Sequence, residues 1–156
     1  MGTATPFEEK EANDSSGFLL WQVTMLWQRS IALALRPHDL TQVQFALLAG
    51  LLWLTQQDEL VTQVMLARHA KLDLTMTSQV LRALESKGLV KRQTHPNDGR
   101  AKVLLLTKKG RACAWKAIPE VEHADGIFFG SMGEHRKHFN VVLRLLIEAS
   151  AAAKIS

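Results

Sequence analysis

The fold is decided by residues 74–110, LTMTSQVLRALESKGLVKRQTHPNDGRAKVLLLTKKG. Residues 74–87 have the spacing of a helix with one polar side, and Gly88 is a typical residue just beyond a helix end. Leu89–Thr94 and Lys102–Leu106 have the pattern of two strands, and the Pro-Asn-Asp-Gly sequence between them favours a turn. This stretch therefore predicts a helix followed by a β-hairpin.

Positive charge is concentrated in the same region. Residues 82–111 contain nine Lys or Arg and two acidic residues, which gives this segment a net charge of +7. The whole chain carries +4, so the remaining residues sum to −3. A focused basic patch on a helix and a hairpin is typical of a nucleic-acid-binding surface.

The composition bounds the class of protein. A length of 156 residues fits one domain, and a hydrophobic content of 47% suffices for a sizeable core. The single cysteine, Cys113, excludes an intramolecular disulfide and suits a reducing compartment. The polar, acidic N-terminus does not resemble a signal peptide, and the longest apolar run, residues 45–54, is too short to span a bilayer. We expect a cytoplasmic protein with no membrane partner.

Helices are predicted on both sides of the helix and hairpin. The expected elements are a flexible tail (1–14), a helix from Ser15 or Ser16 to about Arg36, a second helix capped by Thr41, a third (Gln63–Lys71) capped by Thr62, a long helix capped by Thr107, and a last helix from about Glu134 to Ala153. Gly126, Gly130 and Gly133 indicate a loose connection between the last two helices. The first helix is apolar on more than one face, so we expect a second subunit to help cover it.

The helix at residues 74–87 has two different faces on a helical wheel. The apolar side holds Met76, Val80, Ala83 and Leu84, with Thr77 and Leu81 at its edge. The opposite side holds Thr75, Ser78, Gln79, Arg82 and Ser86. Arg, Gln and hydroxyl side chains hydrogen-bond base edges in the major groove. Alone, such a face is more often an ordinary solvated surface.

The hairpin strengthens the DNA-binding interpretation. Its turn holds Asp98 and Arg100 beside a proline and a glycine. A short basic hairpin can follow the DNA backbone and insert an Arg into a narrow minor groove. Asp98 can orient the Arg100 guanidinium through a bidentate pair. The simpler alternative is a surface turn with a weak ion pair.

Taken in order, these motifs resemble the MarR (multiple antibiotic resistance regulator) family. The matching segments are Leu40–Gln42, Leu66-Ala67, Thr77–Glu85, Lys87–Arg92, Asp98–Lys102, and Leu106-Thr107 before Gly110. The resemblance implies a mainly α fold with a small β-hairpin wing. In it, a winged helix–turn–helix lobe (37–111) lies between N- and C-terminal dimerisation helices (15–36 and 112–156). The resemblance also implies a homodimeric regulator that binds a pseudo-palindromic double-stranded operator and is released by a small ligand or by thiol oxidation.

Two sets of site residues follow. The expected DNA contacts are Thr75, Thr77, Ser78, Gln79, Arg82, Arg92, Asp98, Arg100 and Lys102. The expected effector pocket is lined from the first two helices by Trp21, Met25, His38 and Trp53. Apolar walls with a few polar groups suit an aromatic acid or a phenol.

Cysteine and histidine residues offer a second kind of regulation. Lys109 and Lys116 would lower the pKa of the Cys113 thiol, but a free cysteine is more often a small buried residue. His135 and His138 have a spacing that can hold a metal, but a solvated face is favoured without a further ligand. A metal- or redox-responsive regulator of the same fold stays an alternative.

A winged-helix module that binds only proteins is the alternative from another class, and the basic segment argues against it. The chain has no hydrolase elbow, P-loop, zinc-protease or dinucleotide motif. We therefore expect no enzyme activity, no cofactor and no metal site.

Overall fold

The computed structural model describes residue 6, residues 12–57 and residues 60–153, without the side chains of residues 12, 100 and 101. The elements are η1 (Ala12–Asp14), α1 (Ser16–Leu35), η2 (Arg36–His38), α2 (Gln42–Thr55), α3 (Gln63–Ala70), α4 (Leu74–Ser86), β1 (Val90–His95), β2 (Asp98–Leu106), α5 (Lys108–Gly130) and α6 (His135–Ala153). The predicted tail lies outside the described residues except for residue 6 and η1. Among the described helices, none has the length and apolar character needed to span a membrane.

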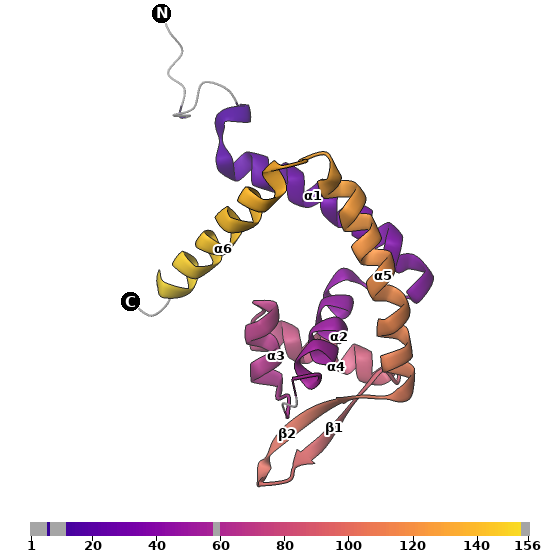
Figure 1. Cartoon of the computed structure of the whole chain (residues 1–156). Helices are drawn as coiled ribbons and strands as arrows, with labels where there is room; N and C mark the ends of the chain where they lie inside the picture. The colour runs from indigo at the N-terminus through magenta and orange to yellow at the C-terminus, as the bar shows by residue number, and fades with distance from the viewer. Residues whose placement is uncertain (1–5, 7–11, 58–59, 154–156) are drawn as a thin grey trace, which may run out of the picture.

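The helices form two connected parts (Figure 1). The long helices α1 and α5 pack along each other, while α2, α3 and α4 lie below them with the hairpin at the far end. Strands β1 and β2 pair antiparallel, with Val90 opposite Leu106. Thr62 forms an isolated antiparallel β-bridge with Val103, and the sheet itself has two strands among the described residues. The predicted mainly α fold with a small wing is confirmed.

Side-chain caps begin the helices where the sequence predicted. Ser15, Thr41, Thr62 and Thr107 each accept a hydrogen bond from the backbone N–H three residues further on. Gln44 completes a capping box, because its side chain accepts from the Thr41 backbone N–H at 3.2 Å. These caps confirm four predicted helix starts.

The connection before α6 differs from the prediction. Gly126 and Gly130 lie inside α5, and only residues 131–134 separate the two helices. Gly133 has a φ of 53° and supplies the turn. Pro119 also lies inside α5, where it cannot donate the usual helical hydrogen bond.

A close backbone contact fixes the start of α5. A Cβ atom on Gly110 would lie 1.9 Å from the carbonyl oxygen of Leu89, so only glycine fits there. The Thr107 backbone N–H donates to the same oxygen at 3.1 Å. The Thr107 hydroxyl donates to the carbonyl oxygen of Gly88 at 2.6 Å. The end of α4, the base of the hairpin and the start of α5 therefore form one packed junction.

Two helices leave large apolar surfaces exposed. On α1, the exposed apolar side chains are Phe18, Leu19, Leu20, Trp21, Val23, Met25, Leu26 and Leu33. On α6, none of whose described residues is buried, they are Val141, Val142, Leu145, Leu146 and Ile147. Figure 1 shows α6 directed away from the other helices. Apolar surface of this extent is typical of an association site.

Candidate nucleic-acid interface and effector pocket

Helix α4 presents a polar face to solvent. Its N-cap is Asp73, whose carboxylate accepts from the Met76 backbone N–H at 2.7 Å. Thr75, Gln79 and Arg82 are exposed, and none of their side chains makes a hydrogen bond or ion pair within the described residues. Ser78, at the edge of this face, is half-buried. The predicted face therefore has the exposure that base contacts require.

Thr77 corrects the prediction for this helix. Its side chain is 0% exposed, and its hydroxyl donates to the Asp73 carbonyl oxygen at 2.7 Å. Because that hydrogen bond satisfies the hydroxyl, Thr77 packs inward with Leu81 and Leu84. Met76, predicted to face inward, is exposed. The expectation that the Thr77 side chain contacts DNA is wrong.

The wing residues have different surroundings. Lys102 Nζ donates to Thr94 Oγ1 at 3.0 Å, so this lysine stays at the surface of the hairpin. Arg92 is half-buried, with its Nε 3.0 Å from Glu85 Oε1, and therefore folds back against α4. Asp98 is exposed at the start of β2. Arg100 lies in the same strand, but its side chain is outside the described part.

Lys87 ties the end of α4 to the start of α2. Its Nζ lies 3.1 Å from Asp39 Oδ2, donates to the Asp39 carbonyl oxygen, and donates to Gln44 Oε1 at 3.2 Å. Lys109 Nζ donates to the Lys87 carbonyl oxygen at 2.8 Å. The sequence places Lys87 at the end of the predicted helix, in the basic segment and in a segment that matches the MarR family. The structure shows that it also positions α4.

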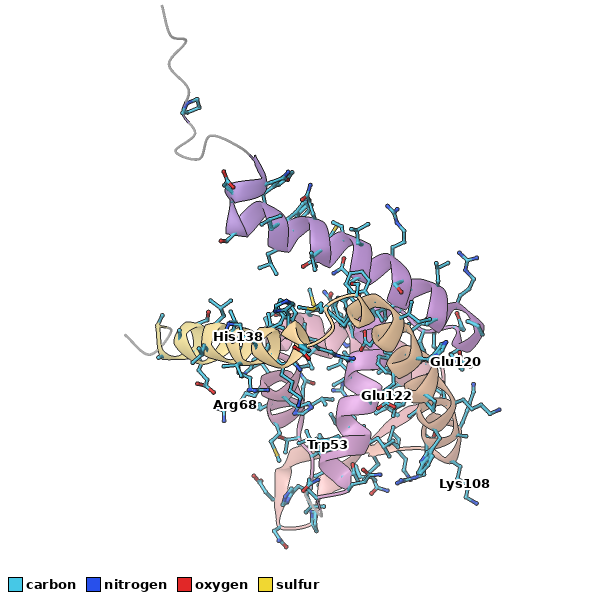
Figure 2. All side chains as sticks on the ribbon, turned by 45° about the horizontal axis from the view of Figure 1, so that its top comes forward. Trp53, Arg68, Lys108, Glu120, Glu122 and His138 are labelled. Carbon is cyan, nitrogen blue, oxygen red and sulfur yellow. The ribbon has the colours of Figure 1, made fainter. Side chains whose placement is uncertain are left out.

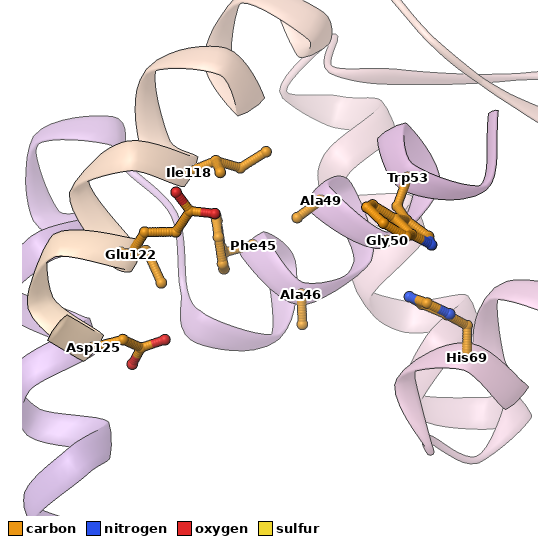
Figure 3. A pocket seen from close by; sticks show the side chains of 10 residues that line it. Phe45, Ala46, Ala49, Gly50, Trp53, His69, Ile118, Glu122 and Asp125 are labelled. Carbon is orange, nitrogen blue, oxygen red and sulfur yellow. The ribbon is translucent and has the colours of Figure 1, made fainter. Parts of the chain in front are cut away.

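A cavity of about 380 Å³ lies between α2, α3 and α5 (Figure 3). Small residues of α2 form its floor, with Trp53 and His69 on one side and acidic residues of α5 on the other. The lining residues are Phe45, Ala46, Ala49, Gly50, Trp53, His69, Ile118, Val121, Glu122 and Asp125. A mostly apolar concave site with a few polar groups suits a small molecule.

Of the four residues predicted for a pocket, only Trp53 lines this cavity. Trp21 and Met25 lie on the exposed side of α1, and His38 is half-buried in η2. Helix α1 packs mainly along α5, where Trp27 Nε1 donates to Asp125 Oδ1 at 2.7 Å, and no described residue of α1 lines the cavity.

The lining residues that sequence reasoning missed lie on α2, α3 and α5. For the residues on α2, the signal was the pair of small side chains Ala46 and Ala49, which leaves a hollow on one face of the helix. Gly50 also allows α3 to approach, since a Cβ there would lie 3.0 Å from His69 Cδ2.

The comparisons with known proteins agree with this geometry. The MarR family model matches residues 40–102. The HTH-type transcriptional regulator YdcH of Bacillus subtilis strain 168 is 43% identical over 119 residues, which cover 76% of this chain and 81% of that protein. The chain belongs to the MarR family.

Two solved structures extend the comparison of this MarR-family chain. CouR from Rhodococcus jostii RHA1, bound to p-coumaroyl-CoA, has 28% identity and a TM-score of 0.74, covering 88% of this chain and 93% of that one. A mutant MarR from E. coli, complexed with operator DNA, has 25% identity and a TM-score of 0.74, covering 83% of this chain and 91% of that one. The winged-helix fold and the role in transcription regulation follow from the family.

Cys113 of this MarR-family protein is half-buried in α5. Burial raises the pKa of its thiol, and this effect outweighs the lowering by Lys109, Lys87 and Lys116. The thiol therefore lacks the low pKa that an oxidant sensor needs. Among the described residues, no group of three or more His, Cys, Asp or Glu is arranged to hold a metal.

The raised pKa of Cys113 predicts slow alkylation of its thiol. We expect iodoacetamide to alkylate the native protein at pH 7 more slowly than it alkylates free cysteine, because less thiolate is present. The rate should rise with pH and should continue to rise above pH 9, because the pKa of this thiol lies above its ordinary value of 9.0. Protein unfolded in urea is the control and should react at the rate of free cysteine. Faster alkylation of the native protein at pH 7 would instead support the redox-responsive alternative.

Proposed function

We propose that this protein is a homodimeric, ligand-responsive repressor that binds a pseudo-palindromic double-stranded DNA operator. Helix α4 enters the major groove, and the hairpin follows the backbone into the adjacent minor groove. The observation that carries this proposal is the exposed polar face of α4, where Thr75, Gln79 and Arg82 have no side-chain partner within the described residues and Arg82 begins the +7 segment. The E. coli MarR structure with operator DNA supports it. A chromosomal DNA target would require the protein to act in the cytoplasm.

The dimer part of the proposal rests on the apolar surfaces of α1 and α6. In this proposal residues 37–111 form the DNA-binding lobe, and residues 15–36 and 112–156 form the dimerisation helices. A two-fold dimer is the simplest closed assembly that covers both surfaces. It would place two α4 helices roughly 34–36 Å apart, in successive major grooves on one side of the DNA.

Disrupting the α6 surface should produce monomers. We expect the Leu145→Glu/Leu146→Glu double variant to sediment as a monomer, because it would bury two charges in the interface. Operator affinity should fall more than tenfold, since the two half-sites would then be bound separately. Asn140→Glu, an exposed polar position of α6, is the control and should leave the dimer intact. Wild-type protein that sediments as a folded monomer would contradict the dimer.

The regulatory part rests on the cavity. CouR is a MarR-like structure bound to a small molecule, which supports an effector here. A ligand acts only by favouring a dimer whose α4 helices are mis-spaced for DNA. A coupling free energy of about 1–3 kcal/mol changes operator affinity by roughly 5–150-fold. Loss of the protein from an operator that overlaps a promoter then restores transcription.

Selection of duplexes from a random pool tests the DNA-binding function directly. We expect enrichment of a two-fold related sequence that is also present upstream of a gene controlled by this protein. Its affinity should fall steeply with salt, because each phosphate neutralised by Lys or Arg releases counterions. A protein-interaction module would enrich no sequence and show no steep salt dependence, which would overturn the proposal.

A further inference from the structure

The cavity carries negative charge. Its lining contains two carboxylates, Glu122 and Asp125, and no Lys or Arg among the described residues. Counting Asp, Glu, Lys and Arg alone, the lining has a formal charge of −2. This charge is opposite to that of the basic segment, which supplies the DNA surface. A site for an aromatic acid needs a positive partner, and this lining provides none from the described part of the chain.

The two carboxylates are available to different extents. Glu122 is exposed on α5, and within the described residues its side chain makes no hydrogen bond or ion pair. Asp125 Oδ1 already accepts from Trp27 Nε1, so this carboxylate has less acceptor capacity left for a ligand than Glu122 has. Figure 3 shows both carboxylates on the α5 side of the cavity. A positively charged group would therefore interact mainly with Glu122.

The rest of the lining suits a flat aromatic ring. Ala46 and Ala49 leave a hollow on α2, while Phe45 and Trp53 supply aromatic surface from the same helix. A ring in this hollow buries apolar area without displacing a large side chain. Aromatic faces also attract cations. The aromatic and acidic parts of the lining thus favour one kind of molecule.

We propose that the cavity binds an aromatic cation, with the ring over the α2 hollow and the cationic group toward Glu122 and Asp125. The proposal rests on the proposed function, because it names the chemical class of the effector at the same site. It replaces the expectation of an aromatic acid, which the two carboxylates would repel.

Three isosteric probes separate charge from shape: benzamidine, benzamide and benzoate. Binding to the full-length protein is measured by titration calorimetry or ligand-observed NMR at low salt. We expect benzamidine to bind most tightly and benzoate most weakly. Because both carboxylates are accessible to water, each should contribute roughly a two- to fivefold difference in affinity. Equal binding of all three probes, or preference for benzoate, would overturn the proposal.

Substitutions of single carboxylates show which of them attracts the positively charged probe. Glu122→Gln should weaken benzamidine binding roughly two- to fivefold and leave benzamide binding unchanged. Asp125→Asn should act in the same direction more weakly, since the substituted amide still has an oxygen to accept from Trp27. Glu120→Gln is the matched control, because Glu120 is exposed on α5 but does not line the cavity. Figure 2 labels both Glu120 and Glu122. An equal effect of the Glu120 and Glu122 variants would refute a local charge contact.

A cavity-filling variant separates this inference from the proposed function. Ala49→Leu should abolish binding of benzamidine and benzamide, because the leucine side chain would occupy the α2 hollow. If Ala49→Leu abolishes probe binding but the charge of the probe does not change its affinity, the cavity is a ligand site and the proposed cationic class is wrong. If benzamidine binds as expected but no operator can be selected, the DNA-binding proposal fails instead.

Discussion

The Gly110→Ala variant should lose about 3 kcal/mol or more of its free energy of unfolding. The added Cβ would lie 1.9 Å from the Leu89 carbonyl oxygen, and that contact is with backbone, which no side-chain rotation relieves. The start of α5 must therefore move, which breaks the Thr107 hydrogen bonds to Gly88 and Leu89. Thermal unfolding should show a decrease in Tm of roughly 6–12 °C for such a loss in a chain of this size.

Gly126→Ala is the matched control for that experiment. Gly126 lies in the same helix, and a Cβ there would meet nothing within 4 Å. Alanine is the better helix former, so this variant should gain about 0.5–1 kcal/mol. Equal stability of the two variants would mean that the packed junction at Gly110 is looser than its geometry indicates.

The Arg82→Ala variant should bind the selected operator about 1–3 kcal/mol more weakly. Arg82 is exposed on the polar face of α4 and has no partner within the described residues, so the substitution removes a DNA contact and not a structural one. If the guanidinium reads a guanine, preference should relax at one base pair in each half-site.

Binding to operators mutated at single base pairs provides the decisive measurement for Arg82. A uniform loss across all sequences would identify a phosphate contact and contradict base reading. Arg36→Ala, an exposed arginine in η2 outside the basic segment, is the control and should bind with wild-type affinity. Far-UV circular dichroism of both variants should match the wild type.

Local chemistry explains why most of the fold could be predicted. A threonine or serine side chain begins a helix through contacts within three residues, so Ser15, Thr41, Thr62 and Thr107 could be assigned directly. Gly88, with a φ of 70°, likewise ends its helix through its own backbone freedom. The start of strand β2 could not be predicted in the same way. The sequence indicates a turn at Asp98, whereas the strand begins at that residue.

The two errors have different physical causes. Met76 was assigned inward by its hydrophobicity, whereas Thr77 takes that place because its hydroxyl bonds the Asp73 carbonyl. The cavity could not be predicted as a unit, since His69 and Asp125 come from helices that meet only in the tertiary structure. Their positions in sequence contain no signal of that meeting.

Pro119 weakens α5 at one point, because its nitrogen cannot donate the usual helical hydrogen bond. It lies beside Ile118 and just before Val121, two residues that line the cavity. A helix bends most easily where a hydrogen bond is missing, so the pivot is at the level of the ligand. The arm from Pro119 to Gly130 is roughly 18 Å long at about 1.5 Å per residue, and a bend of about 10° would swing its end by about 3 Å. The other arm is held at Gly110, so we expect ligand-driven bending to displace α6 more than the hairpin.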